Sequence, residues 1–203
     1  MTSTSPRCEH EPCGQPLRIT ARRHARFCSP KCRAAAHRAR RSVPAELTAR
    51  PRWVRRTARK VPVTVGGAVA SSTDASTWST YRDAARSSAG VGLGFVLDGD
   101  GIVVLDLDHC LDGDQVAPWA QGVLDAAAGC WVERSAGGDG LHVWGRGALP
   151  GGAGRRLRLG AGTVEAYGTA RYVAVTGRTF GDAPLRLGDL SEVLHLLGLG
   201  GGE

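Results

Sequence analysis

The feature that most constrains the fold of this chain is an apolar run, residues 102–105, that continues into Asp106-Leu107-Asp108. In a β-strand, residues i and i+2 lie on the same face, so Asp106 and Asp108 are predicted to point one way and Leu107 the other. Two carboxylates at the end of a buried strand need compensation by a cation, and oxygen ligands favour Mg²⁺ or Mn²⁺. For an isolated pair of this kind, a strand end that extends into solvent is the alternative.

Apolar periodicity predicts an α+β domain over residues 61–197, with a mostly antiparallel sheet and helices packed on it. The predicted strands cover residues 92–97, 102–108, 130–134, 141–145, 163–167 and 171–176, and the predicted helices cover residues 74–86, 115–128 and 189–197.

Basic residues are concentrated near the N-terminus. Residues 1–60 contain 16 Lys/Arg and 3 Asp/Glu, a net charge of +13, whereas residues 61–203 carry −6 within the total of +7. Such asymmetry is typical of a nucleic-acid-binding arm joined to a more neutral domain. A solvated basic tail without a binding role is the alternative.

Four cysteines in the basic segment form two close pairs, Cys8 with Cys13 and Cys28 with Cys32, separated by 14 residues. Two such pairs are typical of a tetrahedral Zn²⁺ site, and a reducing cytosol disfavours disulfides. His10 lies within the first pair and could replace one cysteine. Unliganded thiols are the alternative.

A helix is predicted from Cys32, and its basic side chains are suited to contacts with phosphate, although such a finger could equally bind protein. These side chains are Arg33, Arg38, Arg40 and Arg41. We therefore expect a zinc-finger basic arm over residues 1–41, a linker over residues 42–60 and a catalytic domain over residues 61–197.

Further polar residues accompany the acidic pair. Ser135 precedes a Gly-rich turn, His142 alternates with apolar neighbours, Glu165 lies mid-strand and Arg171 follows a short turn. Strand-borne acids with a histidine and an arginine suit phosphoryl transfer, because acids bind metals while His and Arg bind phosphate oxygens. A lone histidine in such a strand is more often a structural residue.

Several short motifs follow one another in order along residues 53–180. They lie at residues 60–62, 70–78, 92–96, 104–108, 135–142, 165–167 and 171–177. Together they resemble the primase-polymerase domain of the archaeo-eukaryotic primase superfamily, specifically the bifunctional DNA primase/polymerase N-terminal group of phages and plasmids.

The resemblance implies an RRM-like catalytic sheet and template-directed transfer of nucleotides to a 3′ hydroxyl, sometimes without a primer. The Mg²⁺ or Mn²⁺ ligands that it implies are Asp106, Asp108 and Glu165. The nucleotide ligands that it implies are Ser135, His142, Arg171 and Lys60.

The partners implied by the resemblance are a single-stranded DNA template and dNTPs or NTPs. The sequence contains no G-x-x-x-x-G-K-[ST] loop, so a separate replicative helicase is a plausible further partner. It contains neither a signal peptide nor an apolar run of about 20 residues, so a cytoplasmic protein without membrane association is expected. Two alternative functions remain open: a non-catalytic zinc-finger DNA-binding replication or regulatory protein, and a metal-dependent nuclease.

Overall fold

The structure is a computed structural model of the 203-residue chain and describes residues 7–8, 13, 15–17, 25–34, 43–151 and 154–200. The chain divides into two compact units, Met1–Ser42 and Val43–Glu203. In the first unit, Arg7 and Pro16 form an antiparallel bridge, and residues 30–34 are helical. Four residues singled out from the sequence lie outside the described residues: His10, Arg38, Arg40 and Arg41.

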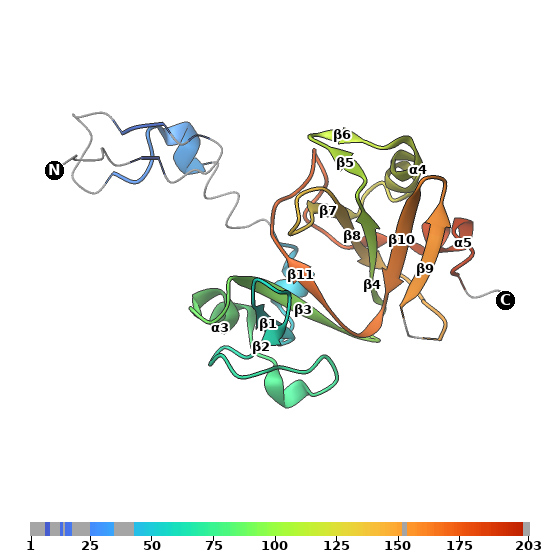
Figure 1. The fold of residues 1–203 in the computed structure, drawn as a ribbon, viewed down its shortest axis with the longest axis horizontal. Coiled ribbons are helices and arrows are strands. Elements are labelled where there is room, and N and C mark those ends of the chain that lie inside the picture. The colour runs from blue at the N-terminus through green and yellow to red at the C-terminus, as the bar shows by residue number, and fades with distance from the viewer. Residues whose placement is uncertain are drawn as a thin grey trace. The chain divides into compact units, whose positions relative to one another are not determined.

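The second unit contains two main sheets and a few short helices (Figure 1). Its strands are β1 (Trp53–Arg56), β2 (Pro62–Val63), β3 (Gly92–Asp98), β4 (Ile102–Asp108), β5 (Leu111–Asp112), β6 (Gln115–Val116), β7 (Trp131–Arg134), β8 (Leu141–Arg146), β9 (Arg155–Leu159), β10 (Gly162–Tyr167), β11 (Thr169–Val175) and β12 (Gly188–Asp189). Its helices are α2 (Ala45–Thr48), the 3₁₀ turn η1 (Ala75–Thr77), α3 (Tyr81–Arg86), α4 (Pro118–Ala126) and α5 (Ser191–Leu196).

The smaller sheet has the order β11-β3-β1-β2, and the larger has the order β12-β8-β4-β10-β9, with β7 also paired to β8. All these pairs are antiparallel except β12 with β8. The prediction of a mixed fold with antiparallel strands and few helices is therefore confirmed. The expectation of one main sheet is wrong, because β11 leaves β10 and pairs with β3 instead of extending the larger sheet.

The larger sheet has a buried apolar core on each face. Helices α4 and α5 cover one face, where Val123 and Val193 belong to the same buried core as Leu105. The smaller sheet covers part of the other face, where Phe95 of β3 packs edge-on to Trp144 of β8 with ring centroids 6.1 Å apart. Because both faces are buried along most of its length, β4 is apolar at nearly every position before its last residues.

The predicted helix over residues 74–86 is wrong in its first half. Asp74 caps the single turn η1, and its Oδ1 accepts a hydrogen bond from the Ser76 backbone N at 3.0 Å. The α-helix begins only after Thr80, whose hydroxyl accepts from the Asp83 backbone N at 3.2 Å. Two capping residues in succession end one turn and start another, which the apolar pattern alone does not reveal.

The segment over residues 42–60 was predicted to be a linker. In the structure it instead contains α2 and β1. Leu47 and Trp53 are fully buried, and the Trp53 indole Nε1 donates to the Leu47 carbonyl at 3.1 Å. Four of the arginines that gave this segment its linker-like composition are buried or partly buried: Arg50, Arg52, Arg55 and Arg56. Arg52, for example, is buried and pairs with Asp100 at 2.6 Å.

Candidate active site

The alternation of side chains along β4 places its two carboxylates on the face that packs against the smaller sheet, just past the last buried residue of that face. Leu105 and Leu107 are fully buried in the core beneath the helices. Val104 is buried on the opposite face, between the sheets, and Asp106 and Asp108 continue its row. The strand is therefore anchored by apolar residues while its acidic end faces a space that the smaller sheet does not fill.

Asp106 lies at the centre of a row of polar side chains that crosses five strands. The register pairs it with Glu165 of β10 on one side and with His142 of β8 on the other. Arg156 of β9 lies opposite Glu165, and Glu133 of β7 lies opposite His142. Neighbouring strands are about 4.8 Å apart, so each side chain in this row contacts the next.

Three acids of the site form one cluster. One carboxylate oxygen from each of Asp106, Asp108 and Glu165 lies within 4.8 Å of the others. The Tyr167 hydroxyl donates to Glu165 Oε2, and Arg156 Nε lies 3.4 Å from Glu165 Oε1. The bond from Tyr167 fixes the orientation of Glu165, so that strand pairing and this side-chain contact together gather the acids.

The electrostatics of Asp106 fit a bound cation. Within the described part of the chain, its Oδ1 is buried and has no hydrogen-bond partner. Burial raises the pKa of the Asp106 carboxyl; His142 opposes this shift, while the charges of Asp108 and Glu165 add to it. A cluster of hard oxygen ligands that includes a buried oxygen without a hydrogen-bond partner is a donor set that suits Mg²⁺ or Mn²⁺.

His142 connects the acidic cluster to a buried carboxylate. Its Nε2 lies 3.6 Å from Asp106 Oδ1, and its Nδ1 lies 3.2 Å from Glu133 Oε1. Burial by itself would lower the pKa of His142, but the hydrogen bond and charge of Glu133, with the charge of Asp106, raise that pKa above its usual value. Because a carboxylate only accepts, Nδ1 carries a proton, and a protonated ring also donates from Nε2 towards the site.

Glu133 is a residue of the site that the sequence analysis did not identify. It is fully buried, and its Oε1 also accepts from the Trp144 indole Nε1 at 3.1 Å. Its Oε2 accepts from the backbone N atoms of Thr176 and Gly177, both at 2.8 Å. These donors compensate the buried charge and fix the carboxylate that orients His142. The available sequence signal was an acid directly after the apolar residues Trp131 and Val132 in a predicted strand.

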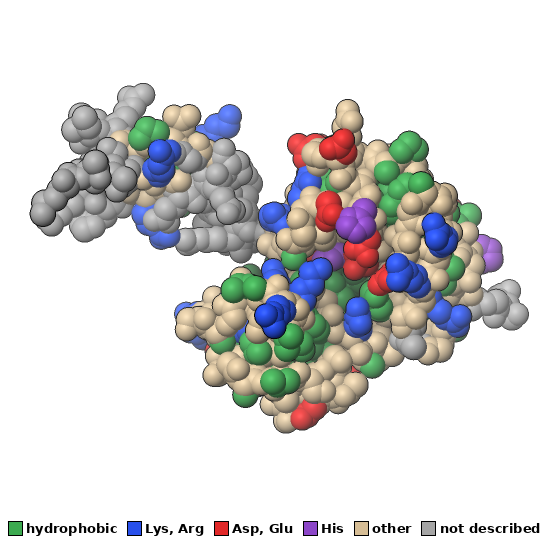
Figure 2. All heavy atoms as spheres, in the orientation of Figure 1, with side chains coloured by type: hydrophobic (Ala, Val, Ile, Leu, Met, Phe, Trp, Pro, Cys, Tyr) green, Lys and Arg blue, Asp and Glu red, His purple; other side chains and the backbone are tan. Residues whose placement is uncertain are grey.

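A pocket of about 330 Å³ opens beside Asp106 and His142. Lys60 and Arg171 contribute to its lining, so two basic side chains face a site that also contains acids. Figure 2 shows acidic and histidine side chains near the middle of this face, with basic side chains on both sides. Such a pocket can accept a polyanion on its basic side while the acids hold cations.

Tyrosines hold the two basic residues of the pocket in place. Lys60 lies in the loop between β1 and β2 with a left-handed φ of 59°, and the Tyr172 hydroxyl donates to its carbonyl oxygen. The Arg171 guanidinium lies over the Tyr167 ring, 4.6 Å from its centroid. A non-glycine residue in the left-handed region is uncommon and requires support from its surroundings, which the bond from Tyr172 provides here.

The remaining predicted nucleotide ligand, Ser135, does not line this pocket. It is 9% exposed, and its backbone N donates to the Gly140 carbonyl at 2.8 Å. A Cβ on Gly140 would lie 2.8 Å from the Leu107 carbonyl oxygen, so glycine allows this loop to pack against the end of β4. The structure thus brings together the other predicted acidic and nucleotide-site residues, and it places Ser135 beside Gly140 at the end of β4.

The chain is similar to a DNA primase-polymerase of Nitratiruptor phage NrS-1. The two are 36% identical over 137 residues, which cover 63% of this chain and 19% of the phage protein. The chain thus spans about a fifth of the length of this curated relative. No family model matches the chain. The similarity supports a relationship to primase-polymerases.

The four N-terminal cysteines also converge. Their Sγ atoms all lie within 4.8 Å of one another, and Cys28 Sγ is 3.5 Å from both Cys13 Sγ and Cys32 Sγ. These separations exceed the disulfide bond length of about 2.05 Å and approach the roughly 3.8 Å between sulfurs around tetrahedral zinc. The cluster with Cys8 is therefore compatible with Zn²⁺.

The helices were compared with the length and apolar character of a membrane span. None of those that the structure describes has both the length and the apolar character needed to cross a bilayer.

Proposed function

We propose that this chain is a primase-polymerase domain that extends a strand by template-directed nucleotidyl transfer in phage or plasmid DNA replication. The single observation that carries the proposal is the row of Glu165, Asp106 and His142 beside a basic pocket. Similarity to a DNA primase-polymerase supports it. On this proposal the larger sheet acts as the RRM-like catalytic sheet.

Asp106, Asp108 and Glu165 would hold two Mg²⁺ or Mn²⁺ ions. Such ions stabilise negative charge on the attacking and leaving oxygens of an in-line displacement. The chain's own contribution is to fix the acids, through strand pairing and through the bond from Tyr167 to Glu165. The buried, unpaired oxygen of Asp106 supports its role as a ligand.

The basic pocket would bind the triphosphate of the incoming nucleotide through Lys60, Arg171 and His142. The primer 3′ oxygen then bonds to the α-phosphorus while the bond from that phosphorus to the β-phosphate bridging oxygen breaks. Pyrophosphate leaves, and the hydroxyl proton passes to solvent. Ser135 as a nucleotide ligand stays a prediction, and its backbone bond to Gly140 favours a role in shaping the loop.

The N-terminal unit would act as a zinc-stabilised arm that binds template DNA. Its convergent cysteines and the net charge of +8 over residues 1–42, from 10 Lys/Arg and 2 Glu, support this role. A single-stranded DNA template with dNTPs or NTPs forms the proposed substrate set. A replicative helicase as partner stays a prediction.

One assay tests the proposed function. The full chain is incubated with single-stranded DNA, Mn²⁺ and labelled nucleotides, with and without a primer, and the products are sized. Metal-dependent growth of the strand is expected. Shortening of the DNA would instead identify a nuclease, and DNA binding without any product would identify a non-catalytic DNA-binding protein.

Deletion of residues 1–41 is expected to remove bound zinc and to weaken template affinity, while extension of an excess preannealed primer partly survives. Phosphate contacts release counterions, so the intact chain should show a steep dependence of affinity on salt that the truncation flattens. Cys28→Ser with Cys32→Ser is the matched control, because it removes zinc ligands and keeps every arginine. Equal salt slopes for the intact and truncated chains would assign another role to the arm.

Glu133→Gln is expected to lower kcat/KM for the nucleotide by roughly ten- to a hundredfold, the range for residues that orient a ligand. The change removes the charge that holds His142 Nδ1, whereas template affinity should stay unchanged. Trp144→Phe is the matched control, because it removes another donor to the same Glu133 oxygen and leaves the histidine bond intact. If both variants lost the same amount of activity, Glu133 would have a structural role and would not specifically orient His142.

A further inference from the structure

The edge strand β9 presents arginines on the face that carries the acidic cluster. Leu157 and Leu159 pack against the core beneath the helices, so Arg156 and Arg158 lie on the opposite face of the strand. Arg155 shares the face of the leucines. The strand is therefore amphipathic across its two faces, and its basic face borders the site.

The register places each of these two arginines beside a row of the site. Arg156 lies opposite Glu165, which pairs with Asp106, and Arg158 lies opposite Thr163, which pairs with Asp108. Both arginines are therefore two strands away from an acid of β4.

Both arginine side chains remain available to a ligand. The Arg156 side chain is 72% exposed, so its ion pair with Glu165 at 3.4 Å is weak. Arg158 is exposed, and no acidic side chain of the described residues forms an ion pair with it. Two accessible cations thus border the acidic cluster on its β9 side.

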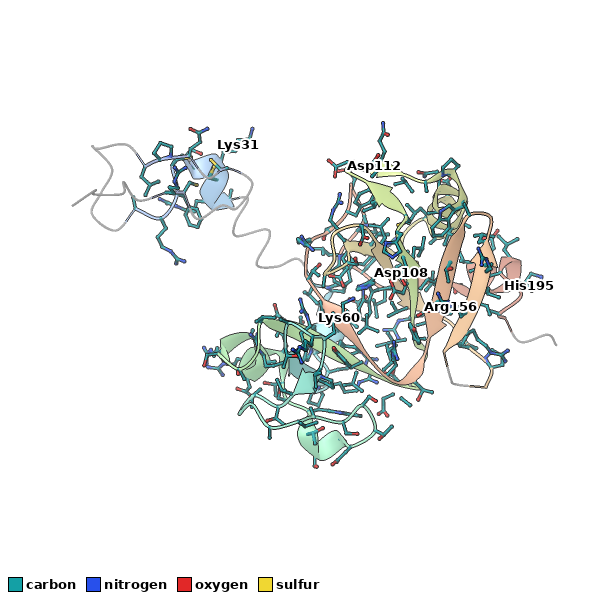
Figure 3. The ribbon with its side chains drawn as sticks, viewed as in Figure 1. Lys31, Lys60, Asp108, Asp112, Arg156 and His195 are labelled. Carbon is teal, nitrogen blue, oxygen red and sulfur yellow. The ribbon has the colours of Figure 1, made fainter. Side chains whose placement is uncertain are left out.

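The pocket and the β9 arginines lie on different sides of the acids. His142, on β8, lines the pocket on one side of Asp106, whereas Arg156 lies on the other side, beyond β10. Figure 3 shows Asp108 with Lys60 on one side and Arg156 on the other. In phosphoryl transfer the attacking and leaving oxygens lie roughly in line, on opposite sides of the phosphorus. If the triphosphate occupies the pocket, the attacking strand therefore approaches the acids from the side of β9.

We propose that Arg156 and Arg158 bind the backbone phosphates next to the 3′ end of the primer strand. This inference rests on the proposed function. A DNA strand that approaches three carboxylates is repelled by them, so local cations are needed there. Charged residues also protect edge strands from aggregation, but Arg155 would serve that purpose equally well.

The test compares two double variants of the full chain that lose the same charge: Arg156→Ala with Arg158→Ala, and Arg82→Ala with Arg155→Ala. Arg82 is an exposed residue of α3. Affinity for a labelled primer–template is measured by anisotropy without nucleotide across a salt series. The first pair should weaken binding by about tenfold or more and reduce the salt slope by roughly 2, whereas the second pair should change little.

Neutral methylphosphonate linkages then identify the strand. When these linkages are placed in the primer next to its 3′ end, the wild-type protein should bind the DNA more weakly. The Arg156/Arg158 variant, which has already lost the contact, should show little further loss of affinity. Placed in the template, they should weaken both proteins equally. Additive losses with primer linkages, or equal binding by the two double variants, would overturn the inference.

Primer extension by the wild type is measured in parallel. If the wild type extends the primer and the two double variants bind primer–template with equal affinity, the primer contact is refuted and the proposed function is retained. Binding that depends on Arg156 and Arg158, with no extension under any metal, refutes the proposed function and retains the DNA contact.

Discussion

Asp106→Asn combined with Asp108→Asn should reduce nucleotide incorporation by roughly a thousandfold or more, because the variant loses two of the three carboxylates that gather at the site. Asparagine keeps the size of the side chain and removes its charge. The variant should also lose Mn²⁺ binding, which calorimetry measures without any reliance on activity.

The fold of this variant should survive. In the wild type, burial and the neighbouring acids raise the pKa of Asp106, so its charged form is unfavourable in the absence of metal. We therefore expect the melting temperature without metal to be equal to or above that of the wild type. Asp98→Asn with Asp182→Asn changes two exposed acids and serves as the control. Synthesis at the wild-type level by the Asp106/Asp108 variant would refute the assignment of these metal ligands.

His142→Asn should lower incorporation by roughly a hundredfold, the range expected for loss of a donor in the transition state. The asparagine amide can take the position of Nδ1 and keep the bond to Glu133, whereas no atom replaces Nε2 beside Asp106. The affinity for template, measured without nucleotide, should change little. His142→Gln is the complementary variant, because its amide reaches towards Nε2 and abandons Glu133.

A third variant, His142→Ala, separates function from stability. It leaves Glu133 without one of its buried donors, which costs about 1–3 kcal/mol of unfolding free energy. His142→Asn should show a smaller loss of stability with a similar loss of incorporation. If template binding falls as far as incorporation in His142→Asn, the histidine does not belong to the nucleotide site.

Local patterns were sufficient for part of the site. The side-chain period of a strand depends on no distant residue, so alternation alone put Asp106 and Asp108 on one face, opposite Leu107. The cysteine spacing likewise predicted a cluster that the described thiols form. By contrast, residues 42–60 were predicted to be a linker, because the composition did not show that Trp53 would be buried.

The sequence by itself determined which faces of its strands are acidic or apolar, because this information is contained within a few neighbouring residues. Only the tertiary structure decided which strands pair, and the register is what aligns Arg156, Glu165, Asp106, His142 and Glu133 in one row. For this reason the sequence did not identify Glu133 as a residue of the site. Its hydrogen bonds are made to His142 and to residues 176–177, which are distant in the sequence. Pairing depends on the free energy of burying both sheets together, which no short segment of the chain encodes.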